Sequence, residues 1–195
     1  MTKPAPIYHE NWYRDEQLTH LAELYKHSTS APGCVIEIGC WEGKSTVALA
    51  NACAPDLLIA VDTWAGNIAE SPNHPSVISA KERDVFAVFC HNIATQTPCN
   101  VLPLVTTSAD FFKMWRTLIR FIHIDASHDY PSVKTEIESA LKHLAPGGIV
   151  CGDDILTSPI TRKDLQGGVE RAVKETLPKF NAIGNLWWWQ KPQNI

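Results

Sequence analysis

The sequence predicts an α/β fold in which a doubly wound, mostly parallel sheet ends in an antiparallel hairpin. Short apolar runs that end in polar residues recur along the chain, and helical patterns separate them. Runs of this length are typical of strands buried on both faces, as in a parallel sheet. A two-residue turn signal near the end of the chain predicts the hairpin. The five parallel runs are "CVIEIG", "LLIAVD", "VLPLVT", "RFIHID" and "GGIVCGDD".

Helical spacing of apolar residues is clearest in two segments. Residues 14–28 predict an N-terminal helix through Leu18, Leu21, Leu24 and Tyr25. Residues 131–145 predict a second helix, with Pro131 near its start and Gly147-Gly148 beyond its end. Its apolar face carries Val133, Ile137, Leu141 and Leu144. A further helix is expected at about 168–177.

The end of the chain and one internal segment break the strand–helix alternation. "FNAI" and "LWWWQK" flank Gly184-Asn185, which predicts the hairpin. Three consecutive tryptophans place side chains on both faces of a strand, so at least one should meet other protein, in the core or at a homodimer interface. Residues 66–80 contain two prolines and no clean period, which predicts a long loop over the carboxyl edge of the sheet, a candidate lid.

The chain as a whole is expected to form one domain. Its 195 residues suffice for a sizeable core, with an N-terminal helical segment at 1–32 and the main domain at 33–195. The net charge is only −4, which gives no broad attraction to nucleic acid or acidic membranes. No apolar run approaches the ~18 residues of a membrane span, and the polar start is not a signal peptide.

Cysteine usage favours a reducing compartment. The six cysteines are scattered without any CxxC pair, and several lie inside apolar runs. This pattern predicts reduced, mostly buried thiols in the cytoplasm and argues against a disulfide framework or a zinc site.

The stretch "IEIGCWEGKSTVALA" decides the class of cofactor. A phosphate-binding P-loop needs four residues between its first glycine and the Gly-Lys pair, whereas three separate Gly39 from Gly43. The nicotinamide fingerprint GxGxxG fails as well, because Trp41 stands where its second glycine would be. Lys44 is therefore interpreted as a solvent-facing residue on the first helical turn.

The remaining pattern is an acid before a glycine loop, followed by Asp62 at the tip of the next strand. A carboxylate in that place can accept two hydrogen bonds from a ribose diol. A ribose-binding acid without a phosphate cradle indicates a nucleoside cofactor that carries no phosphates. S-adenosylmethionine fits this description.

Three segments together carry a family resemblance. "VIEIGCWEGKST", "AVDTWAGN" and "FIHIDASHDYPSVKTEIESALKHLAPGGIVCGDDI" resemble the class I S-adenosylmethionine-dependent methyltransferases. The likeness is greatest to the small metal-dependent O-methyltransferases of the macrocin O-methyltransferase type (methyltransferase family 24), and it covers roughly residues 33–190. It implies a Rossmann-like seven-stranded sheet, terminal hairpin included, with cofactor and substrate above its carboxyl edge.

The resemblance also implies roles for individual residues. The loop around the methionine part of the cofactor would comprise Glu37, Gly39, Cys40, Trp41 and Gly43, with Ser45 nearby. Asp62 would hold the ribose, with Thr63 and Trp64 beside it. Ser108 and Ala109 would lie beside the adenine, and Asp125 would also contact the cofactor. Trp41 and Trp64 could equally be plain core or surface aromatics, and Ser108 could be a helix N-cap.

Three carboxylates are expected to meet at one edge of the sheet. Asp125 ends one strand, and Asp153-Asp154 end the next one along the chain. A divalent cation would remove their mutual repulsion, and all-oxygen ligands favour Mg²⁺, Mn²⁺ or Ca²⁺. The family likeness supports the same three residues as metal ligands. For Asp153 or Asp154 alone, a loop or capping role is the plainer interpretation.

His128, three residues after Asp125, is the candidate base that takes the proton from a substrate hydroxyl. The alternative is a loop histidine bonded to backbone, and His123 inside "FIHID" is expected to be a packed strand histidine. Relatives often have a second acid before this histidine. Here the position is Ser127, which cannot replace a carboxylate.

Three functions follow as hypotheses. The first is metal-dependent O-methylation of a small molecule that bears a hydroxyl, such as a sugar, an antibiotic or a catechol. The second is oxidative chemistry like that of the cephalosporin hydroxylase-type relatives, which three aspartates and a single nearby histidine argue against. The third is a non-catalytic nucleoside-binding protein.

Overall fold

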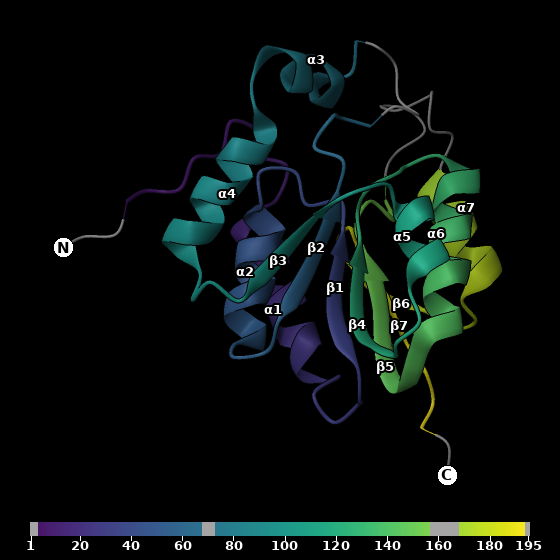
Figure 1. The fold of residues 1–195 in the computed structure, drawn as a ribbon. Coiled ribbons are helices and arrows are strands. Elements are labelled where there is room, and N and C mark those ends of the chain that lie inside the picture. The colour runs from purple at the N-terminus through teal and green to yellow at the C-terminus, as the bar shows by residue number, and fades with distance from the viewer. Residues whose placement is uncertain (1–3, 68–72, 157–167, 194–195) are drawn as a thin grey trace.

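The computed structural model describes residues 4–67, 73–156 and 168–193, and it shows an α/β sandwich around one sheet (Figure 1). The strand order is β3-β2-β1-β4-β5-β7-β6. The strands are β1 (Cys34–Ile38), β2 (Leu58–Asp62), β3 (Val101–Val105), β4 (Ile119–Ile124), β5 (Leu144–Gly152), β6 (Asn181–Ile183) and β7 (Leu186–Gln190). The helices are α1 (Asp15–Lys26), α2 (Lys44–Cys53), α3 (Pro75–Glu82), α4 (Val85–Gln96), α5 (Ser108–Met114), α6 (Tyr130–His143) and α7 (Gly168–Thr176).

The predicted sheet is confirmed, including its seven strands and its terminal hairpin. β1 to β5 pair in parallel, whereas β7 runs antiparallel to both β5 and β6. Trp187 is 1% exposed and packs among the α6 and α7 side chains, while Trp188 packs on the opposite face. The tryptophan strand therefore meets the core on both faces, and the homodimer stays a prediction.

Helices cover both faces of the central strands, which explains their continuous apolar runs, whereas the edge strand β3 leaves Leu102 and Val105 exposed, so the prediction that this run is buried on both faces is wrong. Val35 belongs to the cluster that β1 forms with α1 and α2, whereas its neighbour Ile36 belongs to the cluster with α5, α6 and α7. Figure 1 shows α1, α2 and α4 on one side of the sheet and α5, α6 and α7 on the other. A third cluster joins α4 to the strand ends through Phe89 and Trp64. The N-terminal segment shares this core through α1, which packs against α2.

The loop predicted for residues 66–80 is in part wrong. Residues 75–82 form the helix α3, while residues 68–72 lie outside the described residues. The His74 ring accepts a hydrogen bond from the Ser76 backbone N–H, and Pro75 occupies the first helical turn. A side-chain cap followed by proline is a helix start, which the missing apolar period concealed.

The cysteines are unpaired, as predicted, but only half of them are buried. All six cysteines are free thiols; Cys40, Cys53 and Cys151 are buried, and Cys90 and Cys99 are exposed. In the part of the chain that the structure describes, no helix has the length and apolar character needed to cross a bilayer.

Candidate active site

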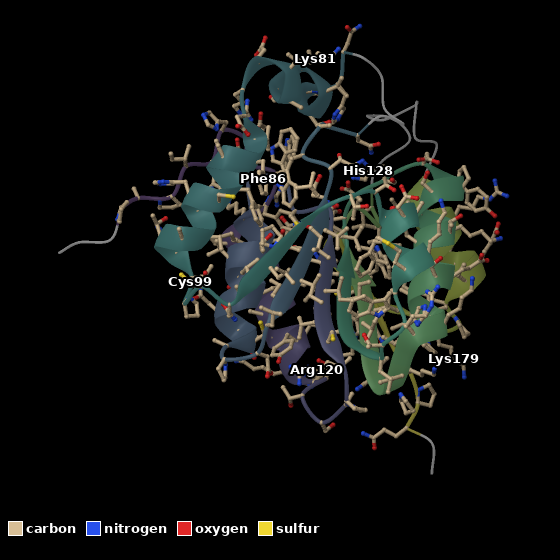
Figure 2. All side chains as sticks on the ribbon, in the orientation of Figure 1. Lys81, Phe86, Cys99, Arg120, His128 and Lys179 are labelled. Carbon is tan, nitrogen blue, oxygen red and sulfur yellow. The ribbon has the colours of Figure 1, made fainter. Side chains whose placement is uncertain are left out.

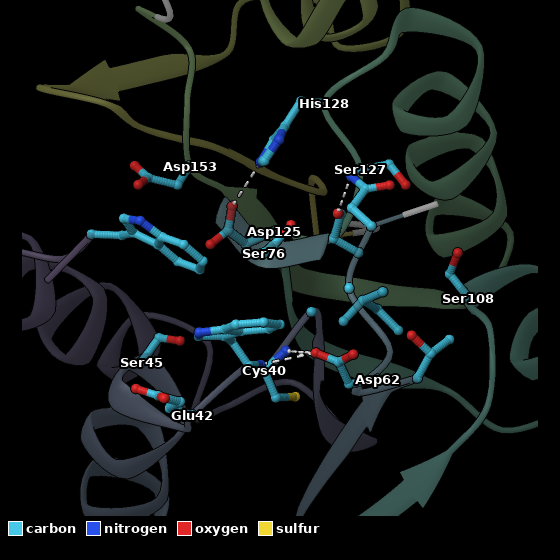
Figure 3. A pocket seen from close by; sticks show the side chains of 18 of the residues that line it. Cys40, Glu42, Ser45, Asp62, Ser76, Ser108, Asp125, Ser127, His128 and Asp153 are labelled. Carbon is cyan, nitrogen blue, oxygen red and sulfur yellow. Dashed lines mark hydrogen bonds and ion pairs between the residues drawn. The ribbon is translucent and has the colours of Figure 1, made fainter. Parts of the chain in front are cut away.

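A cavity of about 710 Å³ opens at the carboxyl ends of the central strands, where the strand order changes direction between β1 and β4. Ligands bind at such a point in open α/β sheets because the two adjacent crossovers leave it on opposite faces. Figure 2 shows His128 at this end of the sheet and Arg120 at the opposite end. Figure 3 shows the cavity with Asp62 on one side and Asp125 and His128 on the other.

The glycine loop after β1 has the close approach that only glycine permits. Gly39 has φ +84°, and a Cβ there would lie 2.3 Å from the backbone oxygen of Asp125. This contact lets the end of β1 lie against the end of β4. Trp41 also adopts the left-handed region, with φ +47°, which is unfavourable for a non-glycine residue. Its backbone N–H is held by Asp62, which stabilises that conformation.

Asp62, the last residue of β2, binds the backbone of the glycine loop. Its Oδ2 accepts the N–H groups of Cys40 and Trp41 at 2.7 and 2.9 Å, and its Oδ1 accepts that of Trp64 at 2.7 Å. Burial raises the pKa of this carboxyl, and the backbone hydrogen bonds oppose that rise. The backbone N–H of Thr63 also acts on this carboxylate, so four backbone groups surround it. The two bonds to a ribose diol stay a prediction.

The N-terminal segment forms a wall of the cavity that the sequence analysis missed. Tyr8, Glu10, Trp12 and Tyr13 all line it. Lys44 Nζ donates to the Tyr13 backbone oxygen at 2.5 Å and to Asn11 Oδ1, so the prediction that Lys44 faces solvent is wrong. The only signal in the sequence is the mixture of aromatic and polar residues in "IYHENWY", which has no helix or strand period.

An ion-pair network ties this segment to the glycine loop. Arg83 binds Glu10 at 2.5 Å and Glu42 at 2.9 Å. Glu42 also accepts the backbone N–H and the ring nitrogen of His9, each at 2.7 Å. Glu10 accepts the indole N–H of Trp41 at 3.0 Å. Glu42, which would have repelled a phosphate, thus anchors the segment over the loop.

At the acidic end of the cavity, two of the three predicted aspartates form a close group with the predicted base. Asp125, His128 and Asp154 offer ligand atoms that all lie within 4.8 Å of one another. His128 Nε2 lies 3.2 Å from Asp154 Oδ2 and 3.7 Å from Asp125 Oδ1. All three side chains are partly exposed, so a small ligand can reach them. This grouping suits a divalent cation.

Asp153 is close by but lies outside that group. It is 8% exposed, and Gln17 of α1 donates to its two oxygens at 3.4 and 3.3 Å. The Trp187 indole N–H donates to its backbone oxygen at 3.1 Å. Burial, together with the charges of Asp125 and Asp154, raises the pKa of Asp153 to about 7. Non-local packing on α1 and β7 fixed this orientation, which the Asp153-Asp154 pair in the sequence could not reveal.

Behind Asp125 lies a buried polar series. The Tyr13 hydroxyl donates to Asp125 Oδ2 at 2.7 Å, and His123 Nε2 lies 3.4 Å from the same hydroxyl oxygen. His123 Nδ1 lies 3.0 Å from Glu37 Oε1, and both side chains are fully buried. Burial disfavours the imidazolium, but the Glu37 carboxylate outweighs it and raises the pKa of His123. The prediction that His123 is a packed strand histidine is confirmed.

Most predicted cofactor residues line the cavity, but four do not. Glu37 is fully buried beside His123, and a Cβ at Gly43 would lie 3.0 Å from the Phe89 ring. Trp64 packs between aromatic side chains of α4 and donates to the Trp41 backbone oxygen at 2.8 Å. Ala109 faces a groove between α5 and α6. The predicted site residues that line the cavity are Gly39, Cys40, Trp41, Ser45, Asp62, Thr63, Ser108, Asp125, His128, Asp153 and Asp154.

Ser108 lies at the expected end of the cavity but does not cap α5. Thr107 is the N-cap, and its side chain accepts the Asp110 N–H at 3.1 Å. The Ser108 hydroxyl donates to Glu136 Oε1 on α6 at 2.6 Å. The hydroxyl oxygen keeps its acceptor capacity for a ligand, because donation uses only the proton.

Comparison with known proteins decides the class. A family described as methyltransferase domain matches residues 36–155, which include the glycine loop, Asp62, Asp125 and Asp154. The chain belongs to this methyltransferase family. No protein of curated function matches the sequence. The family favours S-adenosylmethionine-dependent methyl transfer over the oxidative and non-catalytic alternatives, and the enzyme is an S-adenosylmethionine-dependent methyltransferase.

Solved structures share the fold of this methyltransferase. Cofactor-bound Rv0187 from MTB superposes with a TM-score of 0.68 at 17% identity, covering 93% of this chain and 82% of that one. The O-methyltransferase TomG from Streptomyces achromogenes, in complex with SAM, gives 0.64 at 18% identity over 93% and 82%. The O-methyltransferase from Bacillus cereus, in complex with SAH, gives 0.61 at 18% identity over 90% and 80%.

Proposed function

We propose that this methyltransferase transfers the methyl group of S-adenosylmethionine to a hydroxyl of a small molecule with the help of a divalent cation. The observation that carries the proposal is the group formed by Asp125, His128 and Asp154 in the wall of the cofactor cavity. TomG and the Bacillus cereus enzyme are both O-methyltransferases, which supports oxygen as the accepting atom. The acceptor would be a sugar, an antibiotic or a catechol-like compound.

The residues of the cavity fit both the nucleoside cofactor and the divalent cation. The Asp62 carboxylate lies on the cavity wall, where it would accept a ribose hydroxyl, and the cavity of about 710 Å³ has room for a nucleoside cofactor beside a small acceptor. Carboxylate oxygens from Asp125 and Asp154 are ligands that Mg²⁺ and Mn²⁺ prefer. Asp153 is the third carboxylate beside them. A cation bound there supplies a Lewis acid that orients a substrate oxygen and stabilises its negative charge.

His128 is proposed as the base. Its Nε2 lies beside both aspartates, so a hydroxyl held at this end of the cavity comes within reach of the imidazole. Ser127 leaves the histidine as the one group in this loop segment suited to take the proton. Trp12 and Trp41, whose ring centroids are 5.4 Å apart, form an apolar part of the cavity wall.

Calorimetry and a turnover assay test this function together. S-adenosylmethionine should bind with and without Mg²⁺. With a hydroxyl-bearing acceptor, the enzyme should form S-adenosylhomocysteine only when the cation is present. The acceptors are a panel of catechols and sugars with adjacent hydroxyls. Asp154→Asn should lower the rate at least tenfold, with partial recovery at high Mg²⁺, whereas Asp110→Asn on exposed α5 should not. Full turnover after chelation would refute the role of the metal.

A further inference from the structure

We propose that Tyr13 is a positioning residue: its hydroxyl fixes the Asp125 carboxylate in the orientation that the reaction uses, and His123 and Glu37 support it from the core. The inference rests on the proposed function in that Asp125 serves there as a ligand of the cation. It assigns a role to an N-terminal residue outside the segment that the family match covers.

The two oxygens of Asp125 have different surroundings. Oδ2 accepts the Tyr13 hydroxyl at 2.7 Å, while Oδ1 faces His128 Nε2 at 3.7 Å. The terminal torsion of an aspartate is broad, so packing of the chain alone does not select one carboxylate plane. A short hydrogen bond to one oxygen does select it. Tyr13 therefore turns the other oxygen toward His128 and Asp154.

Tyr13 itself is held from several directions. Its side chain is 8% exposed, and its ring meets the His123 ring edge-on at a centroid distance of 6.3 Å. Its backbone oxygen accepts Lys44 Nζ at 2.5 Å, which ties the residue to the first turn of α2. A hydroxyl on a ring fixed in this way holds a direction that a mobile surface tyrosine could not. Preorganised donors of this kind cost little reordering when the ligand binds.

The support continues into the core of the sheet. His123 on β4 lies between the Tyr13 hydroxyl, 3.4 Å from Nε2, and Glu37 on β1, 3.0 Å from Nδ1. Both residues are completely buried, where polar side chains are retained only with partners. The register pairs Glu37 directly with His123 across the strands. Glu37, His123 and Tyr13 thus form a series of polar contacts that ends at one carboxylate oxygen of Asp125.

Another tyrosine provides a matched control. Tyr25 on α1 is 3% exposed, and its hydroxyl also donates to an aspartate, Asp56 Oδ2, at 3.4 Å. Asp56 precedes β2 and therefore lies at the end of the sheet away from the cavity. Tyr13→Phe and Tyr25→Phe each remove one phenol oxygen from a buried tyrosine. Only the first removes a contact to the site.

The first experiment titrates Mn²⁺ alone into the full-length wild type and both variants and follows free Mn²⁺ by electron paramagnetic resonance. Tyr13→Phe should weaken Mn²⁺ binding about tenfold, as expected when a residue that orients a metal ligand is lost. Tyr25→Phe should stay within about twofold of the wild type by the same reasoning. With an acceptor from the panel, Tyr13→Phe should lower kcat and leave the KM for S-adenosylmethionine unchanged. Unchanged Mn²⁺ affinity and kcat in Tyr13→Phe would overturn the inference.

A second measurement is independent of the cation. In a thermal double-mutant cycle, Tyr13→Phe should lower the Tm of the wild type more than it lowers that of Asp125→Ala, because the partner is already gone. Additive Tm shifts would show that the two side chains are not coupled and would also overturn the inference. If the wild type binds no Mn²⁺, the metal part of the proposed function fails. The thermal cycle then decides the Tyr13–Asp125 contact on its own.

Discussion

Glu136→Gln should stabilise the protein at neutral and alkaline pH and have little effect in acid. Glu136 lies on α6 with 3% exposure, and its Oε1 accepts the Ser108 hydroxyl at 2.6 Å. Burial raises the pKa of its carboxyl from 4.5 to about 7, and the negative charge of Asp129 adds to that rise while the Ser108 bond opposes it. A glutamine has nearly the same shape and can still accept from Ser108, but it carries no charge.

The magnitude follows from linkage between proton binding and folding. Below about pH 4.5 the carboxyl is protonated in both the folded and the unfolded state, so its burial does not lower the free energy of unfolding. Between 4.5 and about 7 the unfolded chain loses the proton while the folded protein keeps it, so stability falls as the pH rises. At about 1.36 kcal/mol per pKa unit, the total loss is about 3 kcal/mol. For a chain of this length, that corresponds to roughly 6–12 °C in Tm.

The assay is thermal unfolding of the wild type and Glu136→Gln from pH 4 to pH 8, without cofactor. The difference in Tm between the two should be near zero at pH 4 and should grow in favour of the variant up to about pH 8. Glu138→Gln is the control, since Glu138 lies two residues further along the same helix and is exposed. If the Tm difference between Glu136→Gln and the wild type is the same at every pH, Glu136 is not held protonated by burial.

Two further substitutions test the cofactor loop and the base. Asp62→Asn places an NH₂ group where at least one backbone N–H needs an acceptor, so it should lower the free energy of unfolding by about 1–3 kcal/mol. It should also reduce the thermal shift that S-adenosylhomocysteine gives. ATP should give no thermal shift in the wild type or in the variant. A full S-adenosylhomocysteine shift in the variant would count against Asp62 as a cofactor residue. His128→Ala should slow methyl transfer roughly 10²-fold or more, with a residual rate that rises with pH, and leave Mn²⁺ affinity unchanged. Loss of Mn²⁺ affinity would instead make His128 a ligand of the metal.

The sequence alone determined the architecture and one side of the site. A parallel strand covered on both faces has to be apolar almost throughout, so the runs of the central strands can be recognised without any knowledge of their partners. The positions of Gly39 and Asp62 were also predictable from the chain direction, because Gly39 directly follows a parallel strand, Asp62 ends the next one, and parallel strands end at the same edge. The same rule placed Asp125 and Asp154 near each other.

Only the tertiary structure decided which side chains face the cavity and which support it. Glu37 belongs to the glycine motif, yet the strand register places it opposite His123 in the core. Asp153 and Asp154 are neighbours, but Gln17 binds the first, while the second, with φ +65°, reaches His128. Such choices depend on partners far away in the sequence, and local pattern carries no information about them.

The clearest case is Tyr13, which is 112 residues from Asp125 along the chain. Its segment has no helical or strand period, because its side chains bind a loop and a strand end instead of packing one face against a core. The periodicity of apolar residues predicts elements that pack one face against a core layer. It does not predict an irregular segment that individual hydrogen bonds hold in place. The sequence therefore determined where the cavity lies in the fold, whereas the packing of the N-terminal segment across the strand ends decided how one wall of that cavity is built.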